Sequence, residues 1–296
     1  MDAFFIRNKD LLMTRSLPLT SGFSSAIENI GAIENKGIEF ALNAKLIATR
    51  NIQWNVSANI SADRNKVTQL YGDNDAVYNI DADRNLQKEG NLFLGESRNT
   101  IYIWKTGGIA QVVDMEHLKN IDFSGRQVNP GDLYPLDIND DKVIDDKDRV
   151  IVGSPDPKFY GGFSTDFSYK GVTLNAVFNY SCGGKKLSPY YESLITSRGT
   201  GIASIDLLDR WTPENTDAKF PRPIYNDPTD TETMYYNTFS ASQMDFSVQN
   251  ASFLRLSTLS LSYTFPKSVS EKMRIGNLRI YSTVYLSLIH ISEPTR

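Results

Sequence analysis

The chain of 296 residues contains one cysteine, Cys182, and two histidines, His117 and His290. A single cysteine cannot form an internal disulfide, and it cannot supply a metal site made of cysteines alone. Neither histidine comes with a plausible nucleophile and an orienting acid, so the sequence gives no basis for a catalytic triad. We therefore expect a protein that is not an enzyme.

Long apolar runs and a basic charge balance are also missing. No stretch of about 18 apolar residues is present, which excludes a transmembrane helix. The formal net charge is −4, and an acidic balance makes nucleic acid an unsuitable partner. These absences leave β-structure as the class to examine.

What the chain does contain is a repeated alternation of apolar and polar residues from about Gly37 onward. In the first run, Ile38, Phe40 and Leu42 alternate with polar neighbours, and a period of two places one set on each face of a strand. Aromatic residues make up 11% of the chain, which favours strands over helices. The predicted strands are Gly37–Ala48, Ile52–Ala62, Phe159–Tyr169, Val172–Ser181, Ser252–Phe265 and Leu278–Leu286.

The lengths of these runs and of their connections suggest a membrane barrel. Roughly 9–11 residues are needed for a tilted strand to cross a bilayer. Short and long connections alternate, as they do when turns lie on the periplasmic side and loops lie outside. The short ones are Thr49–Asn51, Lys170–Gly171 and Pro266–Asn277, and the long, polar ones are Asn65–Lys158 and Cys182–Ala251.

Three local expectations follow from the same pattern. The apolar phase slips within Ser252–Phe265, which predicts a β-bulge near Ser257. The segment Met1–Lys36 is interpreted as a strand near Ala3–Arg7 that rises into a third external loop. Thr100–Lys105 is a candidate for a small hairpin arm within the first long connection.

The alternation predicts two faces of opposite character. Lipid cannot solvate polar side chains, whereas a wet lumen can, so the apolar set should face outward. The residues expected on the lipid side are Phe40, Leu42, Val56, Ile60, Phe167, Leu174 and Phe178. Those expected on the lumenal side are Glu39, Asn43, Lys45, Asn55, Asn59, Asp166 and Asn175. An ordinary antiparallel sheet with one face on a soluble core would show the same alternation and stays open as the alternative.

Four segments carry distinctive motifs, which occur in order along the chain. The segment Asn29–Glu39 (NIGAIENKGIE) resembles a hallmark of the SusC/RagA-type TonB-dependent outer-membrane transporters, and Asn51–Val67 is similar to the strand pair that follows it in that family. Asp137–Pro155 resembles the acidic loop of the family and leads into its Gly-Ser-Pro-Asp-Pro exit. Ser252–Leu256 and Leu259–Pro266 resemble a strand near the family's C-terminus.

The resemblance implies an all-β fold, namely an antiparallel transmembrane β-barrel wall. Family members are 22-stranded barrels with an N-terminal plug, and this chain has too few strands to close such a barrel. Residues 1–286 would be the C-terminal part of the barrel, an open partial segment with unpaired edges, without the plug domain and the TonB box. Residues 287–296 resemble a translated sequencing adapter and are interpreted as a non-native tail. Met1–Asp10 shows no signal peptide, so we expect a gene fragment cut at both ends.

The resemblance also implies a function, which is nutrient uptake at the cell outer membrane. The parent protein would import oligosaccharides or peptides, with energy coupled through TonB. The implied partners are outer-membrane lipid, a SusD-like surface lipoprotein, the TonB complex through the missing N-terminal region, and a glycan or peptide substrate. The alternative is a secreted, calcium-stabilised, carbohydrate-binding β-domain, which would be soluble without detergent.

One local motif suggests a metal, although no cofactor is required by the implied function. Side-chain oxygens between residues 137 and 148 recur at positions 1, 3, 5, 9 and 12 of an EF-hand-type loop, with a backbone carbonyl at position 7. The candidate Ca²⁺ ligands are Asp137, Asn139, Asp141, Val143, Asp145 and Asp148. Lys142 stands where glycine normally makes the sharp turn, and Asp148 replaces the longer glutamate. A solvated acidic loop is the alternative.

Aromatic residues in the second long connection are candidates to stack on sugars or to contact the partner lipoprotein. Packing within the loop is the alternative role for them. They are Tyr190, Tyr191, Trp211, Tyr225, Tyr235 and Tyr236.

Overall fold

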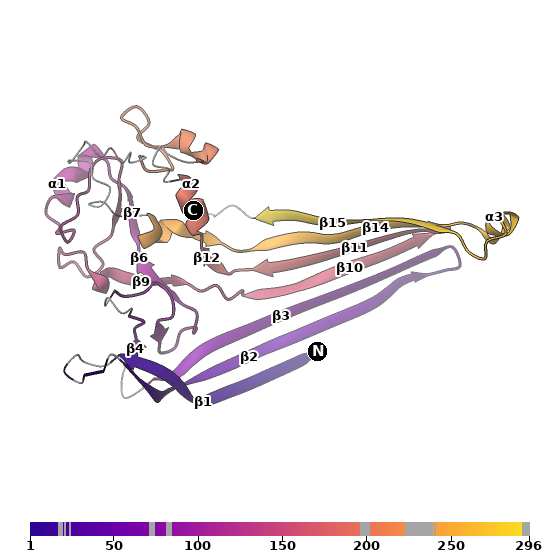
Figure 1. Cartoon of the computed structure of the whole chain (residues 1–296), viewed down its shortest axis with the longest axis horizontal. Coiled ribbons are helices and arrows are strands. Elements are labelled where there is room, and N and C mark those ends of the chain that lie inside the picture. The colour runs from indigo at the N-terminus through magenta and orange to yellow at the C-terminus, as the bar shows by residue number, and fades with distance from the viewer. Residues whose placement is uncertain are drawn as a thin grey trace.

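The computed structural model describes residues 1–16, 20, 22–23, 25–70, 75–80, 85–195, 202–222, 239 and 241–291. Within these residues, seven long strands form one antiparallel sheet whose first and last strands do not pair, so the sheet is open (Figure 1). The strands in spatial order are β1 (Asp2–Ser16), β2 (Ser25–Ala48), β3 (Ile52–Leu70), β10 (Phe159–Tyr169), β11 (Val172–Cys182), β14 (Phe253–Thr264) and β15 (Arg279–Ile291). The predictions of an all-β, antiparallel, open wall are confirmed.

The turn between β10 and β11 shows how local sequence builds this sheet. Lys170 and Gly171 both have positive φ, at 45° and 90°, which is the geometry of a two-residue type I′ turn. A Cβ on Gly171 would lie 2.6 Å from the carbonyl oxygen of Thr264 on the neighbouring strand. Glycine is therefore required at this position by both its φ and its close approach to β14.

The register of the strands confirms the predicted division into two faces. Phe167 lies opposite Trp54 on β3 and opposite Leu174 on β11, so apolar residues share one face. The adjacent Asp166 lies opposite Asn55 and Asn175, which places the polar set on the other face. Among the described residues, no second sheet covers the apolar set: Phe40, Leu42, Ile60, Phe167 and Leu174 are between 37% and 48% exposed.

The predicted β-bulge is present at Ser257. The pairing of β11 with β14 shifts between Val177–Thr258 and Phe178–Leu256, which leaves Ser257 without a partner in the register. Its hydroxyl instead accepts a hydrogen bond of 2.7 Å from the Asn179 side chain. The extra residue restores the apolar phase of β14 on both sides of the bulge.

Two expectations about the connections were wrong. The residues after Arg7 do not form a loop up to Lys36, because β1 continues to Ser16 and β2 begins at Ser25. Pairing is favoured there because it buries Ala32 and Ile33, the latter in a small core with Val67, Leu70 and Leu92.

The predicted hairpin arm at Thr100–Lys105 is a single strand instead. Strand β6 (Ile101–Trp104) pairs with the distant β9 (Arg149–Gly153), and all four of its residues are buried. A strand buried on both faces carries no alternation that would identify its partner.

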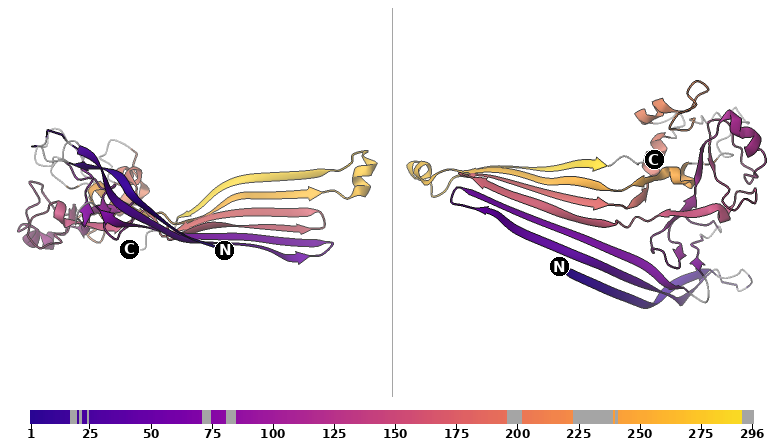
Figure 2. Two further views of the ribbon diagram at one scale, coloured as in Figure 1. Left: turned by 90° about the horizontal axis from the view of Figure 1, so that it is seen from below. Right: turned by 180° about the vertical axis from the view of Figure 1, so that it is seen from behind.

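The two long connections gather at one end of the sheet, opposite the short connection that contains α3 (Lys267–Lys272), as the two further views also show (Figures 1 and 2). We call the described parts of residues 71–158 and 183–252 the loop assembly. No helix among the described residues is long and apolar enough to cross a membrane. The remaining elements are the strands β4 (Ala76–Val77), β5 (Leu92–Phe93), β7 (Thr106–Ile109), β8 (Leu133–Pro135), β12 (Lys185–Leu187) and β13 (Val248–Asn250), and the helices α1 (Met115–Leu118) and α2 (Pro189–Ile195). Short 3-10 helices occupy Val112–Asp114, Asp146–Asp148, Ile205–Asp209, Ala241–Gln243 and Asp245–Ser247.

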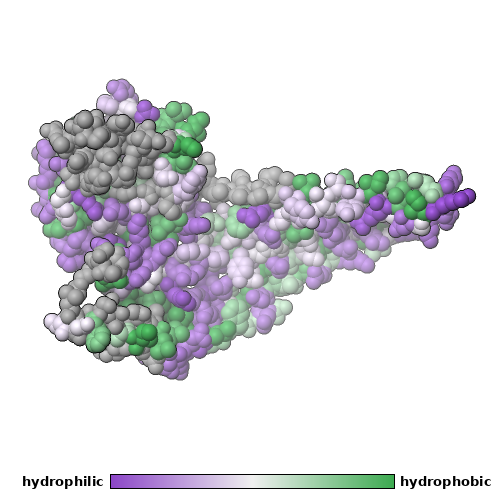
Figure 3. Space-filling model, in the orientation of Figure 1, coloured by the Kyte–Doolittle hydropathy of each residue, from purple (hydrophilic) through white to green (hydrophobic). Residues whose placement is uncertain are grey.

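The main hydrophobic core lies in the loop assembly and not against the sheet. It combines Trp104, Phe123 and Leu133 of the first long connection with Phe239 and Met244 of the second. Figure 3 shows green apolar residues along the sheet, between the loop assembly and the polar tip at α3. The sheet thus has an uncovered apolar surface, while the loop assembly has a packed interior that can position side chains.

Candidate functional site

An ion pair with a buried carboxylate joins the two long connections. The Arg222 guanidinium donates two hydrogen bonds to the Asp132 carboxylate, at 2.7 and 3.2 Å, and Asp132 is 3% exposed. The backbone N–H of Arg222 also donates to the carbonyl of Gly131 at 2.9 Å. Because such a bidentate pair fixes the orientation of both groups, it holds the second connection against β8.

The acidic loop between residues 137 and 148 is closed by its last carboxylate. The two oxygens of Asp148, which is fully buried, accept hydrogen bonds of 2.9 Å from the backbone N–H groups of Ile138 and Asp145. The first and last turns of the loop are therefore held together. A carboxylate has about four acceptor sites, so these two bonds do not saturate Asp148.

The first half of the loop is ordered by side chains that accept from its own backbone. Asn139 accepts from the N–H of Asp141, Asp141 from that of Val143, and Asp137 from that of Lys142, at 2.8–2.9 Å. Lys142 has a positive φ of 64°, so it adopts the backbone conformation for which glycine was expected. The second oxygen of Asp137 is buried and has no hydrogen-bond partner among the described residues.

The structure brings the candidate ligands into one loop, but it does not assemble a metal cluster. In the part of the chain that is described, no group of three or more His, Cys, Asp and Glu side chains is placed to hold a metal ion. A backbone hydrogen bond from Lys147 holds the pKa of Asp145 below its usual value, and the ammonium group of Lys147 lies 3.3 Å from that carboxylate. The calcium ligand set stays a prediction.

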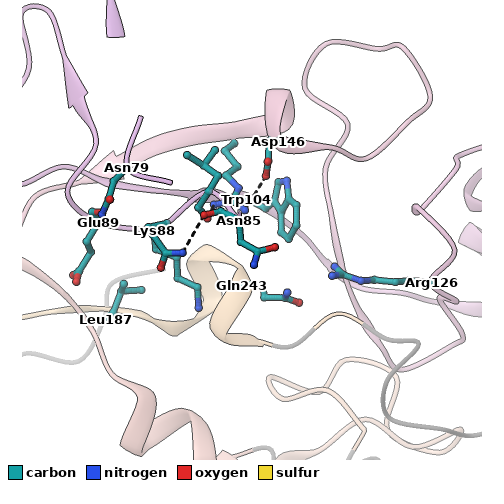
Figure 4. A pocket seen from close by; sticks show the side chains of 12 residues that line it. Asn79, Asn85, Lys88, Glu89, Trp104, Arg126, Asp146, Leu187 and Gln243 are labelled. Carbon is teal, nitrogen blue, oxygen red and sulfur yellow. Dashed lines mark hydrogen bonds and ion pairs between the residues drawn. The ribbon is translucent and has the colours of Figure 1, made fainter. Parts of the chain in front are cut away.

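A polar pocket of about 790 Å³ lies beside this loop (Figure 4). Trp104 connects the two features, because its indole N–H donates to the carbonyl of Asp145 at 2.7 Å while its ring lines the pocket. The guanidinium of Arg149 lies 4.8 Å from the centroid of that ring and forms an ion pair of 2.8 Å with Asp146. The lining residues come from positions 79, 85–89, 104, 126, 146, 149, 187 and 243. Sequence reasoning missed the pocket, since no local motif relates these separate segments.

The candidate external aromatics fall into different environments. Trp211 is 8% exposed and donates a hydrogen bond of 2.9 Å to Gln111, so it packs within the loop assembly. The Tyr191 hydroxyl donates to Asp206 at 3.0 Å. Tyr190 is 75% exposed and remains a candidate contact. The predictions for Tyr225, Tyr235 and Tyr236 lie outside the described residues, as does the side chain of His290.

Comparisons with known proteins relate this architecture to one group of receptors. No family model matches the chain. TonB-dependent receptor P3 of Formosa agariphila is 31% identical over 281 residues, which cover 95% of this chain and 26% of the receptor. TonB-dependent receptor SusC of Bacteroides thetaiotaomicron is 26% identical over 291 residues, which cover 96% of this chain and 26% of the receptor.

Among solved structures, the RagAB peptide transporter matches with a TM-score of 0.69 and 23% identity, over 97% of this chain and 29% of that chain. An open state of the RagAB peptide importer matches with a TM-score of 0.65. The structural match confirms the fold, because TonB-dependent receptors are outer-membrane β-barrels and the open sheet matches part of such a barrel.

The present chain spans about a quarter of the length of the curated relatives it matches. The sequence similarity extends over nearly the whole of this chain, and it agrees with the strand order and the uncovered apolar face of the sheet. The chain is a homologue of the SusC/RagA-type TonB-dependent receptors.

Proposed function

We propose that this chain forms part of the wall and external loops of a transporter that imports oligosaccharides or peptides across the outer membrane. The observation that carries the proposal is the division of the sheet into an uncovered apolar face and a polar face. An apolar face of this kind is suited to lipid, and a polar face is suited to the wet interior of a barrel.

The polar face has the properties of a lumenal surface. Asn175 donates to Asp166 at 2.6 Å between β11 and β10, and the hydroxyls of Ser260 and Thr283 lie 3.0 Å apart between β14 and β15. These bonds satisfy polar groups laterally, along the sheet, and leave the face open to water. Binding and passage of a substrate along such a surface need no covalent chemistry, which agrees with a protein that is not an enzyme.

The proposal includes partners. The structures that match are titled RagAB peptide transporter and RagAB peptide importer, and a curated relative is SusC. We propose a SusD-like surface lipoprotein as the partner that meets the loop assembly, and the TonB complex as the source of energy. The proposed substrate is an oligosaccharide or a peptide, which the whole transporter would import.

The test is uptake by cells that carry or lack the gene. Labelled oligosaccharides and peptides should enter cells with the gene, and uptake should be lost on deletion and also when TonB is removed. Re-expression of the wild-type gene is the control for the deletion. Uptake that is unchanged in both deletions would contradict the proposal, and so would recovery of the protein as a stable monomer without detergent, as expected for a secreted carbohydrate-binding domain.

A second, structural role is proposed for the acidic loop, which would bind calcium through Asp137, Asn139, Asp141, Val143, Asp145 and Asp148. The supporting observation is the buried oxygen of Asp137 that has no hydrogen-bond partner among the described residues. A buried, unpaired oxygen of a carboxylate is costly, and a hard cation would satisfy it. The bound ion would then stabilise β9, which follows the loop directly.

The matched variants for this role are Asp141→Asn and Asp140→Asn, measured by calorimetry with calcium on the protein in detergent. Asp141→Asn keeps an oxygen acceptor but removes one ligand charge, so calcium affinity should fall by about tenfold. Asp140 occupies a non-ligand position with a positive φ of 59°, which asparagine tolerates, so affinity should change less than about twofold. Equal affinities in the two variants, or no heat at millimolar calcium, would contradict the proposal.

A further inference from the structure

The polar pocket of the loop assembly has more cationic than anionic groups in its lining. Lys88, Arg126 and Arg149 line it together with two carboxylates, Glu89 and Asp146. Asp146 is already engaged, because its carboxylate forms the 2.8 Å ion pair with Arg149. The Lys88 ammonium group donates to the carbonyl of Ser242. Arg149 and Lys88 thus each have an acceptor, and Arg126 is the third cation in the lining.

Arg126 is a half-buried cation whose neighbours are aromatic rings. Its guanidinium carbon lies 4.5 Å from the ring centroid of Phe239 and 5.7 Å from that of Trp104. Among the described residues, no carboxylate or other acceptor forms a hydrogen bond or an ion pair with the guanidinium. Burial lowers the pKa of Arg126, which means that the surroundings disfavour the charge. Cation–π contacts offset part of that cost but satisfy none of the N–H donors in the guanidinium plane.

The side chain of Arg126 extends from its loop toward the interior of the pocket, on the side of Trp104, Asn85 and Gln243 (Figure 4). A second donor is also unsatisfied at this site, because the Nε–H of Arg149 is buried and has no partner among the described residues. Two guanidinium groups with unused donors therefore lie around one aromatic ring, that of Trp104.

We propose that this pocket binds a carboxylate group of the transported substrate, with Arg126 as the residue that pairs with it. A carboxylate matches the planar fork of a guanidinium with two parallel hydrogen bonds, which a neutral hydroxyl or amide cannot form. The volume of about 790 Å³ is within the usual range of about 300–1,000 Å³ for small-ligand sites. This inference rests on the proposed transport function and narrows its substrate class to acidic ligands.

A carboxylate can be presented by a uronic-acid oligosaccharide or by an acidic peptide, and the experiment separates these sources. Calorimetry on the wild-type protein in detergent compares an oligogalacturonate with its methyl ester, and a Glu-containing peptide with its Gln-containing counterpart. In at least one pair, the acidic form should bind about tenfold or more tightly, equivalent to about 1.4 kcal/mol. The pair that shows the difference identifies the source. Equal affinities within both pairs would overturn the proposal.

The matched variants are Arg126→Met and Arg98→Met. Methionine keeps an unbranched apolar stem against Trp104 and Phe239 but removes the charge, so the preference for the acidic form should disappear. Arg98 is exposed and lies outside the pocket lining, so its variant should keep the preference. An Arg126→Met protein that melts like wild type and still prefers the acidic form would refute the assignment. If that variant fails to fold, the wild-type ligand pairs still decide the proposal.

The outcome is separable from that of the transport proposal. Uptake of neutral oligosaccharides or peptides that depends on TonB, combined with equal binding of acidic and neutral forms, would leave transport standing and reject the carboxylate site. Absence of any uptake would reject transport, whatever the calorimetry shows.

Discussion

Replacing Ala58 with arginine puts a charge on the apolar face of the sheet, whereas replacing its neighbour Ser57 puts the same charge on the polar face. Both residues lie on β3, an interior strand of the sheet, and both are half-buried. Ala58 is opposite Leu42 and Phe163, and Ser57 is opposite Asn43 and Ser164. The two variants therefore share residue type, strand and depth, and they differ mainly in the face that they modify.

The expected magnitude follows from the depth of the site. Ala58 lies six residues beyond Ile52, where β3 begins. At about 3.4 Å per residue and a tilt of about 40°, that distance is about 15 Å along the membrane normal. The apolar band of such barrels is about 25 Å tall, so Ala58 lies close to its middle, where arginine costs about 2–4 kcal/mol. Ser57→Arg should cost less than about 1 kcal/mol, because a wet interior solvates the charge.

The assay is the free energy of folding into lipid vesicles, obtained from denaturant titrations of the wild type and of both variants. An Ala58→Leu variant controls for side-chain size on the apolar face and should stay within about 1 kcal/mol of wild type. The reasoning would be refuted if Ser57→Arg destabilised the protein as much as Ala58→Arg. That result would mean that the polar face is the one that lacks water.

Two further predictions concern the loop assembly. Arg222→Met leaves the buried Asp132 carboxylate without its partner and should destabilise the loops by about 2 kcal/mol, less than for a fully buried pair because Arg222 is about one-third exposed; unchanged rates of limited proteolysis would contradict this. Burial, reinforced by Tyr78, raises the pKa of Tyr102 to about 12. Because the usual tyrosine pKa is about 10, neutral Tyr102 contributes fully to the free energy of unfolding below pH 10. This contribution is lost as the pH rises toward 12, by up to about 2–3 kcal/mol. Absorbance titration of the wild type against Tyr102→Phe measures the pKa of Tyr102, and ionisation near pH 10 would refute the prediction.

The parts of the fold that could be predicted from the sequence are those whose two faces meet different solvents. Between Ile52 and Ala62 apolar and polar residues alternate, as the proposed division between lipid and water requires. Strand β3 continues to Leu70, but Asp63–Lys66 consists of charged and polar residues and shows no such alternation. Its continuation depends on pairing with β2 and on packing of Val67 and Leu70 against Leu92, a contact that local sequence does not reveal.

The acidic loop and the pocket also differ in how far they can be recognised from the sequence. The acidic loop was recognisable because its candidate ligands lie within twelve consecutive residues, so their spacing is visible directly. The pocket was not, because Lys88, Trp104, Arg126 and Gln243 come from separate segments that are brought together by the core of the loop assembly. Pairing of β6 with β9 places Trp104 beside Arg149, and this pairing spans a sequence separation that no local pattern encodes.

Trp104 links the two proposed sites, which predicts that they are coupled. Its N–H donates to the carbonyl of Asp145, in the acidic loop, while its ring lies under Arg126 and Arg149 in the pocket. If calcium orders the loop, it also fixes the ring against which Arg126 is placed, so calcium should tighten carboxylate binding. Linkage requires the carboxylate ligand to tighten calcium binding by the same factor.

Trp104→Phe keeps an aromatic ring but removes the N–H, so each ligand should still bind while the mutual enhancement is lost. Calorimetry of each ligand with and without the other measures both factors. Equal factors in the wild type and in Trp104→Phe would show that this hydrogen bond carries no coupling, and unequal factors within the wild type would show that the two ligands do not act through one binding equilibrium.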